Sequence, residues 1–166
     1  MSLFKQIPVF LVFFLLQGCG FQTVYNANQK DAFLESSEIM IGAIPDRSGQ
    51  ILRNNLLFAL NPKGLKPKPK YILNIRLSES TQSLALRKTA FATRVNLKIK
   101  SEFNLIRIKD KKSLHFGNSE ITVSYNIIKS EFATIAVKKN ALNRGLLEIS
   151  RNTKSQLRTY FSRVQN

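Results

Sequence analysis

The sequence of 166 residues has one cysteine, Cys19, one histidine, His115, and no tryptophan. One cysteine excludes a disulfide within the chain, and a zinc site needs about four nitrogen or sulfur ligands. Acidic residues are also scarce, because 10 Asp and Glu oppose 26 Lys and Arg and leave a formal net charge of +16. We therefore predict no metal ion and no cofactor. Hydrophobic residues make up 43%, which is enough for a packed core.

The most apolar stretch lies at the N-terminus. Lys5 precedes ten apolar residues, Ile7–Leu16, which are too few to cross a bilayer as a helix because a span needs about 20 residues. A basic start, a short apolar run and small residues behind it are typical of a secretory signal peptide. We interpret residues 1–18 as this signal. The alternative is a buried N-terminal strand or helix.

Cys19 follows this run at a position that gives it a chemical role. Leu16-Gln17-Gly18-Cys19 resembles a bacterial lipobox, in which the chain is cleaved before the cysteine and the thiol carries a diacylglycerol. Gln17 departs from the usual small or β-branched residue. Several acyl chains hold a protein on a membrane, because each buried CH₂ contributes about 0.8 kcal/mol. Residue 20 is glycine and not aspartate. By resemblance to enterobacterial lipoprotein sorting, this favours an anchor at the periplasmic face of the outer membrane rather than retention in the inner membrane. The alternative is an ordinary buried cysteine.

The remaining chain contains a strand and a helix before a proline-rich connection. The apolar run Ile39–Ile44 predicts a strand, and leucines at every fourth position predict a helix over Gln50–Leu60, with Asp46 or Ser48 as its N-cap. Asn61-Pro62 ends this helix. The predicted divisions are a signal peptide, a lipidated tether and one folded domain, at residues 1–18, 19–38 and 39–166.

Alternating apolar and polar residues predict three further strands. These are Tyr71–Glu79, Thr89–Ile108 and Leu114–Tyr125, with Ser80–Lys88 as a loop or distorted strand end and Lys109–Lys112 as a hairpin tip. The final stretch, Ser130–Val164, predicts a long helix capped by Ser130. Its apolar stripe includes Ile135, Leu142, Leu146, Ile149, Thr153, Leu157, Tyr160 and Val164.

The order of these elements predicts an α+β fold. The first strand, the first helix and the next strand can form a βαβ unit, and the later strands form an antiparallel meander. The result is a two-layer sandwich in which two helices cover one dry face of a mixed four-stranded sheet. Gly145 in the last helix either allows a close approach to the sheet or marks a bend.

Positive charge is concentrated in two stretches. Lys63–Lys112 holds fourteen Lys and Arg residues against three acids, and Lys129–Asn166 holds eight against two. Many of these cations fall on the predicted wet strand face or at its loops, where they would attract a polyanion. In an outer membrane the abundant polyanion is lipopolysaccharide, whereas a signal peptide argues against nucleic acid. The alternative is a solvated basic face without a partner.

Four carboxylates are the available candidates for catalysis. None stands beside a second catalytic group in the sequence, and His115 has no serine–aspartate arrangement around it. The four are Glu79, Glu102, Asp110 and Glu120. An enzyme is therefore the weaker alternative, and we predict a protein without catalytic residues.

Short motifs along the mature chain match one family in order and spacing. They are Gly18-Cys19-Gly20-Phe21 followed by Tyr25, Arg53-x-x-Leu56, Tyr71–Glu79, Thr89–Arg94, and Ser124-Tyr125-Asn126 followed by Phe132-Ala133. With them the chain resembles the lipopolysaccharide-assembly lipoprotein of the outer-membrane lipopolysaccharide translocon. The family's cleavage-site pattern is GCGF-x-P-L-Y, and Thr23-Val24 replaces its Pro-Leu.

The resemblance implies a fold, partners and a binding site. Such proteins are two-layer α+β sandwiches that are anchored in the outer membrane, plug a large β-barrel, help it assemble and bind lipopolysaccharide during its delivery to the surface. They bind it through basic residues between the second and third strands and near the start of the last helix. The matching positions here are Arg87, Lys88, Lys138 and Lys139.

Two other kinds of lipoprotein would share the same anchor. One is an accessory lipoprotein of another envelope machine, such as the outer-membrane barrel-assembly complex. The other is a lone basic lipoprotein that binds peptidoglycan or another polyanionic polymer. Both would carry lipid on Cys19, so the partner protein distinguishes the three alternatives.

Overall fold

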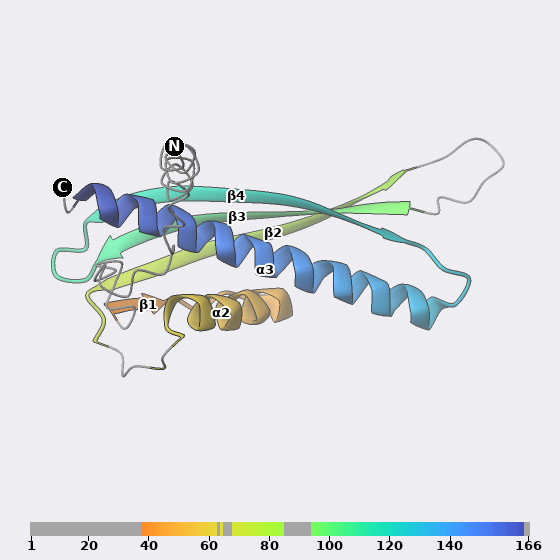
Figure 1. Ribbon diagram of the computed structural model, residues 1–166, viewed down its shortest axis with the longest axis horizontal. Coiled ribbons are helices and arrows are strands. Elements are labelled where there is room, and N and C mark those ends of the chain that lie inside the picture. The colour runs from red at the N-terminus through yellow and green to blue at the C-terminus, as the bar shows by residue number, and fades with distance from the viewer. Residues whose placement is uncertain (1–37, 63, 65–67, 85–93, 165–166) are drawn as a thin grey trace, which may run out of the picture. The chain divides into compact units, whose positions relative to one another are not determined.

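A computed structural model describes residues 38–62, 64, 68–84 and 94–164, which form a sheet with two helices (Figure 1). The elements in chain order are β1 (Ile39–Ile41), α2 (Asp46–Leu60), β2 (Tyr71–Leu84), β3 (Arg94–Arg107), β4 (Ser113–Asn126) and α3 (Glu131–Val164). The strands lie in the order β1-β2-β3-β4, with β1 parallel to β2 and the other neighbours antiparallel. The predicted βαβ unit, meander and α+β sandwich are confirmed.

The predictions for the N-terminal residues and for the connection between β2 and β3 lie outside the described residues. These are the signal peptide at residues 1–18, Cys19, most of the tether at residues 19–38, and Arg87 and Lys88 between β2 and β3. The first part of the predicted strand Thr89–Ile108 also falls in this connection, and β3 is described from Arg94.

The first helix begins earlier than the leucine spacing predicts. Asp46 is already its first residue, and the N-cap is Pro45, which makes no side-chain capping bond, so the predicted caps Asp46 and Ser48 are wrong. Gly49 explains the early start, because it lies buried against Ile44 in the first turn. A Cβ atom at Gly49 would lie 2.8 Å from the Ile44 carbonyl oxygen. The missing side chain therefore lets the turn close over the chain that leaves β1.

The second strand continues beyond its predicted end at Glu79. Ser80 pairs with Lys98 and Ser83 with Val95, so part of the stretch predicted as a loop or distorted end belongs to β2. These polar residues have no apolar alternation that would reveal a strand. Their pairing with β3 keeps them extended, because each ladder position satisfies backbone donors and acceptors.

One face of the sheet is dry, as the alternation in β3 predicts. Val95, Leu97, Ile99, Ser101, Phe103 and Leu105 are all buried, whereas the residues that alternate with them are exposed or half-buried. The core that covers this face consists of leucines and isoleucines from every layer. Its fully buried members are Ile44, Leu52, Leu56, Leu73, Leu97, Ile99, Leu105, Leu146, Ile149 and Leu157.

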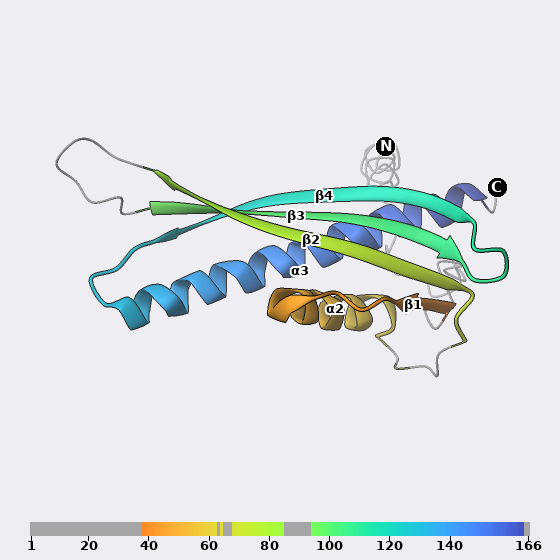
Figure 2. The same cartoon turned by 180° about the vertical axis from the view of Figure 1, so that it is seen from behind.

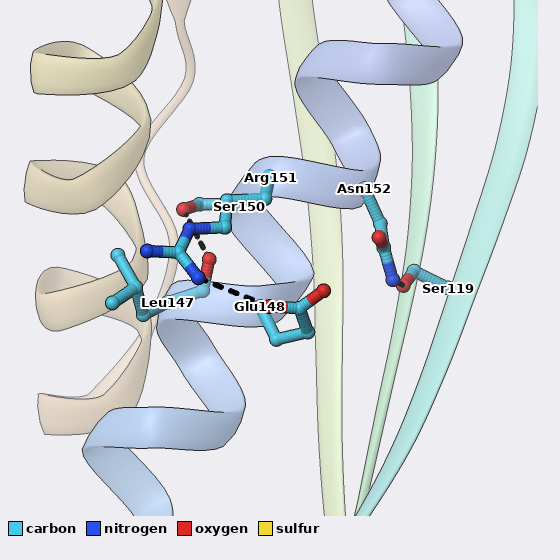
Figure 3. A network of polar contacts seen from close by, with 6 residues as sticks. All are labelled: Ser119, Leu147, Glu148, Ser150, Arg151 and Asn152. Carbon is cyan, nitrogen blue, oxygen red and sulfur yellow. Dashed lines mark hydrogen bonds and ion pairs between the residues drawn. The ribbon is translucent and has the colours of Figure 1, made fainter.

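The long helix α3 approaches the sheet closely at Gly145. A Cβ atom there would lie 2.4 Å from Cδ1 of Ile99 and 3.2 Å from Cγ2 of Val123. The predicted close approach of helix and sheet at this glycine is therefore confirmed. Farther along, Asn152 Nδ2 donates to Ser119 Oγ at 3.2 Å (Figure 3). This bond satisfies two polar groups where the helix crosses β4.

The opposite face of the sheet has no covering layer among the described elements. Figure 2 shows β2, β3 and β4 in front, with both helices behind them. We call this side the open face; it carries the even-numbered residues of β2, β3 and β4, with a register irregularity near Ile106. No helix within the described ranges is long and apolar enough to cross a membrane.

The two helices differ in length, and this exposes one end of α3. At about 1.5 Å per residue, the 34 residues of α3 extend about 51 Å and the 15 residues of α2 about 22 Å. The first buried residue of α3 is Ala141, ten residues after its start. Ile135 and Val164, predicted as members of the buried stripe, are 57% and 64% exposed. The stripe is thus longer than the core that it meets.

Shortening Leu146 to alanine tests the packing of α3. Leu146 is fully buried, so Leu146→Ala should lower the free energy of unfolding by about 2–5 kcal/mol through lost burial and a residual cavity. Its neighbour Leu147 is 41% exposed, and Leu147→Ala should cost less than about 1 kcal/mol. Chemical denaturation of the full chain measures both values. Equal losses would contradict this orientation of the helix.

Candidate functional site

Unpaired positive charge gathers where β4 ends and α3 begins. Arg94, the first residue of β3, pairs with Asn126, the last of β4, and α3 starts shortly after. Two of the predicted site residues, Lys138 and Lys139, lie exposed in the early turns of α3. We call this region the basic end and define it by Arg94, Lys129, Lys138, Lys139 and Arg144, all of which are exposed.

The cations of the basic end are free to meet a ligand. None of them forms an ion pair with another residue in the described part of the chain. The acid nearest to them in the chain, Glu131, lies in the first turn of α3, where the helix dipole favours a negative charge. The predicted partners Arg87 and Lys88 belong to the connection outside the described residues, so the structure places only one pair of the predicted site.

Apolar side chains lie beside these cations and are exposed to solvent. Phe132 is 87% exposed, although it falls on the same helical stripe as Ile135 and the buried Leu146. Ile127 and Ile128, which precede the helix, are also exposed. The helical periodicity predicts Ile135 in the core, and the sequence gives no reason to include Phe132, Ile127 or Ile128 in the site. Their spacing does not indicate exposure, because the apolar periodicity of a helix is the same whether or not another element covers it.

The chain before α3 is held in place by local hydrogen bonds. Ala133 N donates to Ser130 Oγ at 3.4 Å, so the predicted cap Ser130 is confirmed. Ile128 N donates to Thr134 Oγ1 at 2.9 Å, which ties the segment before the helix to its first turn. Ile128 thereby lines a small cavity of about 270 Å³. The other lining residues are Ser124, Tyr125, Asn126, Val137, Asn140 and Arg144.

The composition of the basic end indicates the class of ligand that it can bind. Lysine and arginine side chains attract phosphate and carboxylate groups, and arginine can contact them through two parallel hydrogen bonds. Covering exposed isoleucine and phenylalanine side chains with apolar groups lowers the free energy, because apolar surface is removed from water. The arrangement therefore suits a ligand that carries negative charge and apolar chains in one molecule.

The open face is less basic than the sequence count predicts. Glu120 in β4 accepts from Lys98 Nζ at 2.5 Å and lies 3.1 Å from Lys100 Nζ, so one acid partly neutralises two lysines. Arg76 and Glu102, directly opposite one another on β2 and β3, balance in charge. The charge available to a polyanion therefore lies at the basic end rather than in the middle of the open face.

The structure also places the four acids considered for catalysis. Glu79 is exposed on β2, and Asp110 lies in the hairpin tip, where the Lys112 backbone N–H and the Arg107 guanidinium lower the pKa of its carboxyl. The register brings Glu102 and Glu120 to diagonal positions on the open face. A carboxyl pair that shares a proton raises one pKa. The pKa of Glu120 is instead lowered, as in an ion-paired carboxylate.

His115 has a structural partner that the sequence does not predict. Its ring stacks on Tyr160 of α3, with centroids 5.0 Å apart, and meets the edge of Phe103. These contacts join the start of β4 to the last turns of α3. In the described part of the chain, no three His, Cys, Asp or Glu side chains lie together in a way that could hold a metal ion.

The pKa of Glu120 provides a test of the lysine contacts. Hydrogen bonds from Lys98 and then Lys100 hold this pKa below its usual value. A lowered folded-state pKa stabilises the fold above the unfolded-state pKa, and this contribution is lost as pH falls through the folded-state value. Glu120→Gln should therefore be less stable than wild type at neutral pH and equal to it in strong acid.

Denaturation curves at several pH values measure this difference, and Glu79→Gln is the matched control because Glu79 has no ion pair with a described residue. Carbon-detected NMR titration should also show the Glu120 pKa rising in Lys98→Met. An unchanged pKa in that variant would contradict the contact.

Comparisons with known proteins add a likeness in fold. No family model and no curated protein matches the sequence. A candidate lipoprotein from Caulobacter crescentus CB15 matches with TM-score 0.62 and 24% identity, over 76% of this chain and 92% of that chain. A minor lipoprotein from Acinetobacter baumannii matches with TM-score 0.60 and 12% identity, over 74% and 92%. Rare lipoprotein B from Shewanella oneidensis matches with TM-score 0.60 and 12% identity, over 77% and 98%. The chain is thus similar in fold to several bacterial lipoproteins.

Proposed function

We propose that this chain is an outer-membrane lipoprotein, anchored through Cys19 at the periplasmic face. Its proposed function is to plug and help assemble the β-barrel of the lipopolysaccharide translocon and to bind lipopolysaccharide during its delivery to the surface. The observation that carries the proposal is the basic end, where unpaired cations lie beside exposed apolar side chains. Lipopolysaccharide has the matching chemistry, because it combines phosphate or carboxylate groups with acyl chains.

Two further observations support the anchor and the plug. The fold is similar to those of bacterial lipoproteins, one of which is a rare lipoprotein B. The lone Cys19 directly follows a short apolar run, which is the place that lipidation requires. The proposal of a barrel partner rests on the family motifs and on the exposed stripe at the start of α3, which a partner's surface could cover.

The proposed mechanism of lipopolysaccharide binding is non-covalent. Lys138 and Lys139 pair with phosphate or carboxylate groups and compete with the divalent cations that bridge neighbouring lipopolysaccharide molecules. Arg87 and Lys88 are proposed to do the same from the connection between β2 and β3. Because Lys138 and Lys139 are exposed, their contacts should weaken with ionic strength.

Purification from the cell envelope tests the proposed partner. A C-terminally tagged chain, extracted in mild detergent, should bring down one large β-barrel protein in near-equal amount, identified by mass spectrometry. Cys19→Ala should leave the membrane fraction or accumulate as an uncleaved precursor, because the acyl chains supply the anchor. Recovery of the barrel-assembly complex, or of no barrel, would contradict the proposed partner. Unchanged fractionation of Cys19→Ala would contradict the anchor.

Charge reversal tests the proposed binding residues. The double variant Lys138→Glu and Lys139→Glu should bind lipopolysaccharide about tenfold more weakly or worse, since one lost charge-assisted contact is worth about 1.5–3 kcal/mol. Arg87→Glu with Lys88→Glu should act in the same direction. Titration of the full chain with purified lipopolysaccharide in detergent measures both affinities.

A matched control is available at the opposite end of β3. Lys111 and Lys112 lie exposed in the β3–β4 hairpin, and reversing both changes the net charge by the same amount. This control should keep its affinity for lipopolysaccharide. It should unfold at about the same denaturant concentration as the double variant of Lys138 and Lys139, because all four lysines are exposed. A control that loses as much affinity would show that only net charge matters.

A further inference from the structure

A second surface with ligand-binding chemistry lies on the open face, away from the basic end. It is a depression of about 550 Å³ across β2, β3 and β4, within the range of small-molecule sites. Two cross-strand rows of open-face residues line it, Asn74–Asn104–Phe116 and Arg76–Glu102–Asn118. Glu102 is eight residues from Arg94 along β3, which corresponds to about 26 Å. The depression is therefore separate from the basic end.

The polar groups of the depression are available to a ligand. The side chains of Asn74, Arg76, Glu102 and Asn118 form no hydrogen bond or ion pair with another residue in the described ranges. Arg76 and Glu102 are directly opposite in register, yet their charged groups do not meet. Asn104 accepts from Ser113 Oγ at 2.7 Å through its Oδ1, which leaves its amide NH₂ free. Hydrogen-bond donors and acceptors are thus both available on the three strands.

An aromatic ring stands among these polar groups. Phe116 in β4 is 70% exposed, directly opposite Asn104 on β3. The buried side chains of the sheet lie on the other face, so the Phe116 ring adds nothing to that core. A large exposed apolar group within a polar surface commonly marks an interaction site. The flat face of such a ring packs against the C–H groups of a sugar ring, while amides and carboxylates bond to its hydroxyls.

The charge of the depression selects the ligand class. Arg76 and Glu102 cancel, and the other lining side chains are neutral, so a polyanion gains nothing here that it does not gain at the basic end. A neutral polyol with many hydroxyl groups satisfies both the free donors and the free acceptors. We infer that this depression is a saccharide-binding subsite that holds uncharged sugars of the lipopolysaccharide, with Phe116 as the stacking platform. The choice of this saccharide rests on the proposed function.

Ligand-observed NMR tests the subsite with the full chain in detergent. The probe is the core oligosaccharide of lipopolysaccharide, released from its lipid and dephosphorylated. Saturation should transfer from the protein to the sugar C–H groups, and calorimetry should give an affinity that Phe116→Ala weakens at least about tenfold. Glu102→Gln, which removes a carboxylate acceptor and keeps the side-chain shape, should also weaken it.

Phe58→Ala is the matched aromatic control. Phe58 is 77% exposed on α2, on the helical side of the sheet, and its removal should leave the affinity for the oligosaccharide unchanged. The unfolding transition of Phe116→Ala should match that of wild type.

Three outcomes of the binding measurements would overturn the inference. They are no saturation transfer, equal affinity of wild type and Phe116→Ala, and binding of a cell-wall glycan fragment in place of the core oligosaccharide. Self-association of wild type that Phe116→Ala abolishes, measured by sedimentation, would assign the face to a second copy instead. If the saccharide inference fails, charge reversal at Lys138 and Lys139 should still weaken the binding of complete lipopolysaccharide. Failure of the proposed function would appear in the envelope purification and the charge-reversal titration, neither of which uses Phe116.

Discussion

The structure depends on burying one face of a four-stranded sheet and leaving the other uncovered. Leu97, Ile99 and Leu105 of β3 lose their contact with water only because α2 and α3 pack over them. Each fully buried side chain of this kind contributes about 1.5–3 kcal/mol. Helix α3 lies close to the sheet because Gly145 has no side chain that would separate it from Ile99 and Val123. Two features of the exposed surfaces are related to this one-sided packing.

The first consequence is an unequal pair of helices. The core requires α3 only from about Ala141 onward, and its earlier turns continue past the buried residues. In these turns the apolar stripe has no partner among the described residues, and the cations beside it form no ion pair with a described residue. The same stripe therefore stabilises the fold in one half of the helix and offers an interaction surface in the other.

The second consequence is a division of chemistry over the exposed surfaces. On the open face, Glu120 engages two lysines and Glu102 balances Arg76, so this surface is polar but nearly neutral. At the basic end, the cations form no ion pair with a described residue and lie beside exposed apolar groups. Under the two proposals, the charged and acylated part of lipopolysaccharide would meet the basic end and its neutral sugars the open face, so one amphiphile would contact both surfaces.

The sequence by itself determined the features that repeat locally along the chain. Alternation in β3, the leucine spacing of α2, the Ser130 cap of α3 and the position of Cys19 after an apolar run are all readable without a partner strand or helix. The α+β class followed from the order of these elements. The sequence also predicted that Lys138 and Lys139 lie in the early turns of α3, because the predicted start of a helix fixes the turn in which each of its residues lies.

The tertiary structure decided everything that depends on pairing between distant segments. Ser80–Leu84 is a strand only because β3 lies beside it, and Ile135 is exposed only because the core ends before it. The pair of Glu120 with Lys98 and the row from Asn74 to Phe116 join residues that are far apart in the chain. Periodicity shows which face of a strand a residue occupies. Register, which the whole sheet sets through its hydrogen-bond ladder and its packing against the helices, decides which residues meet on that face.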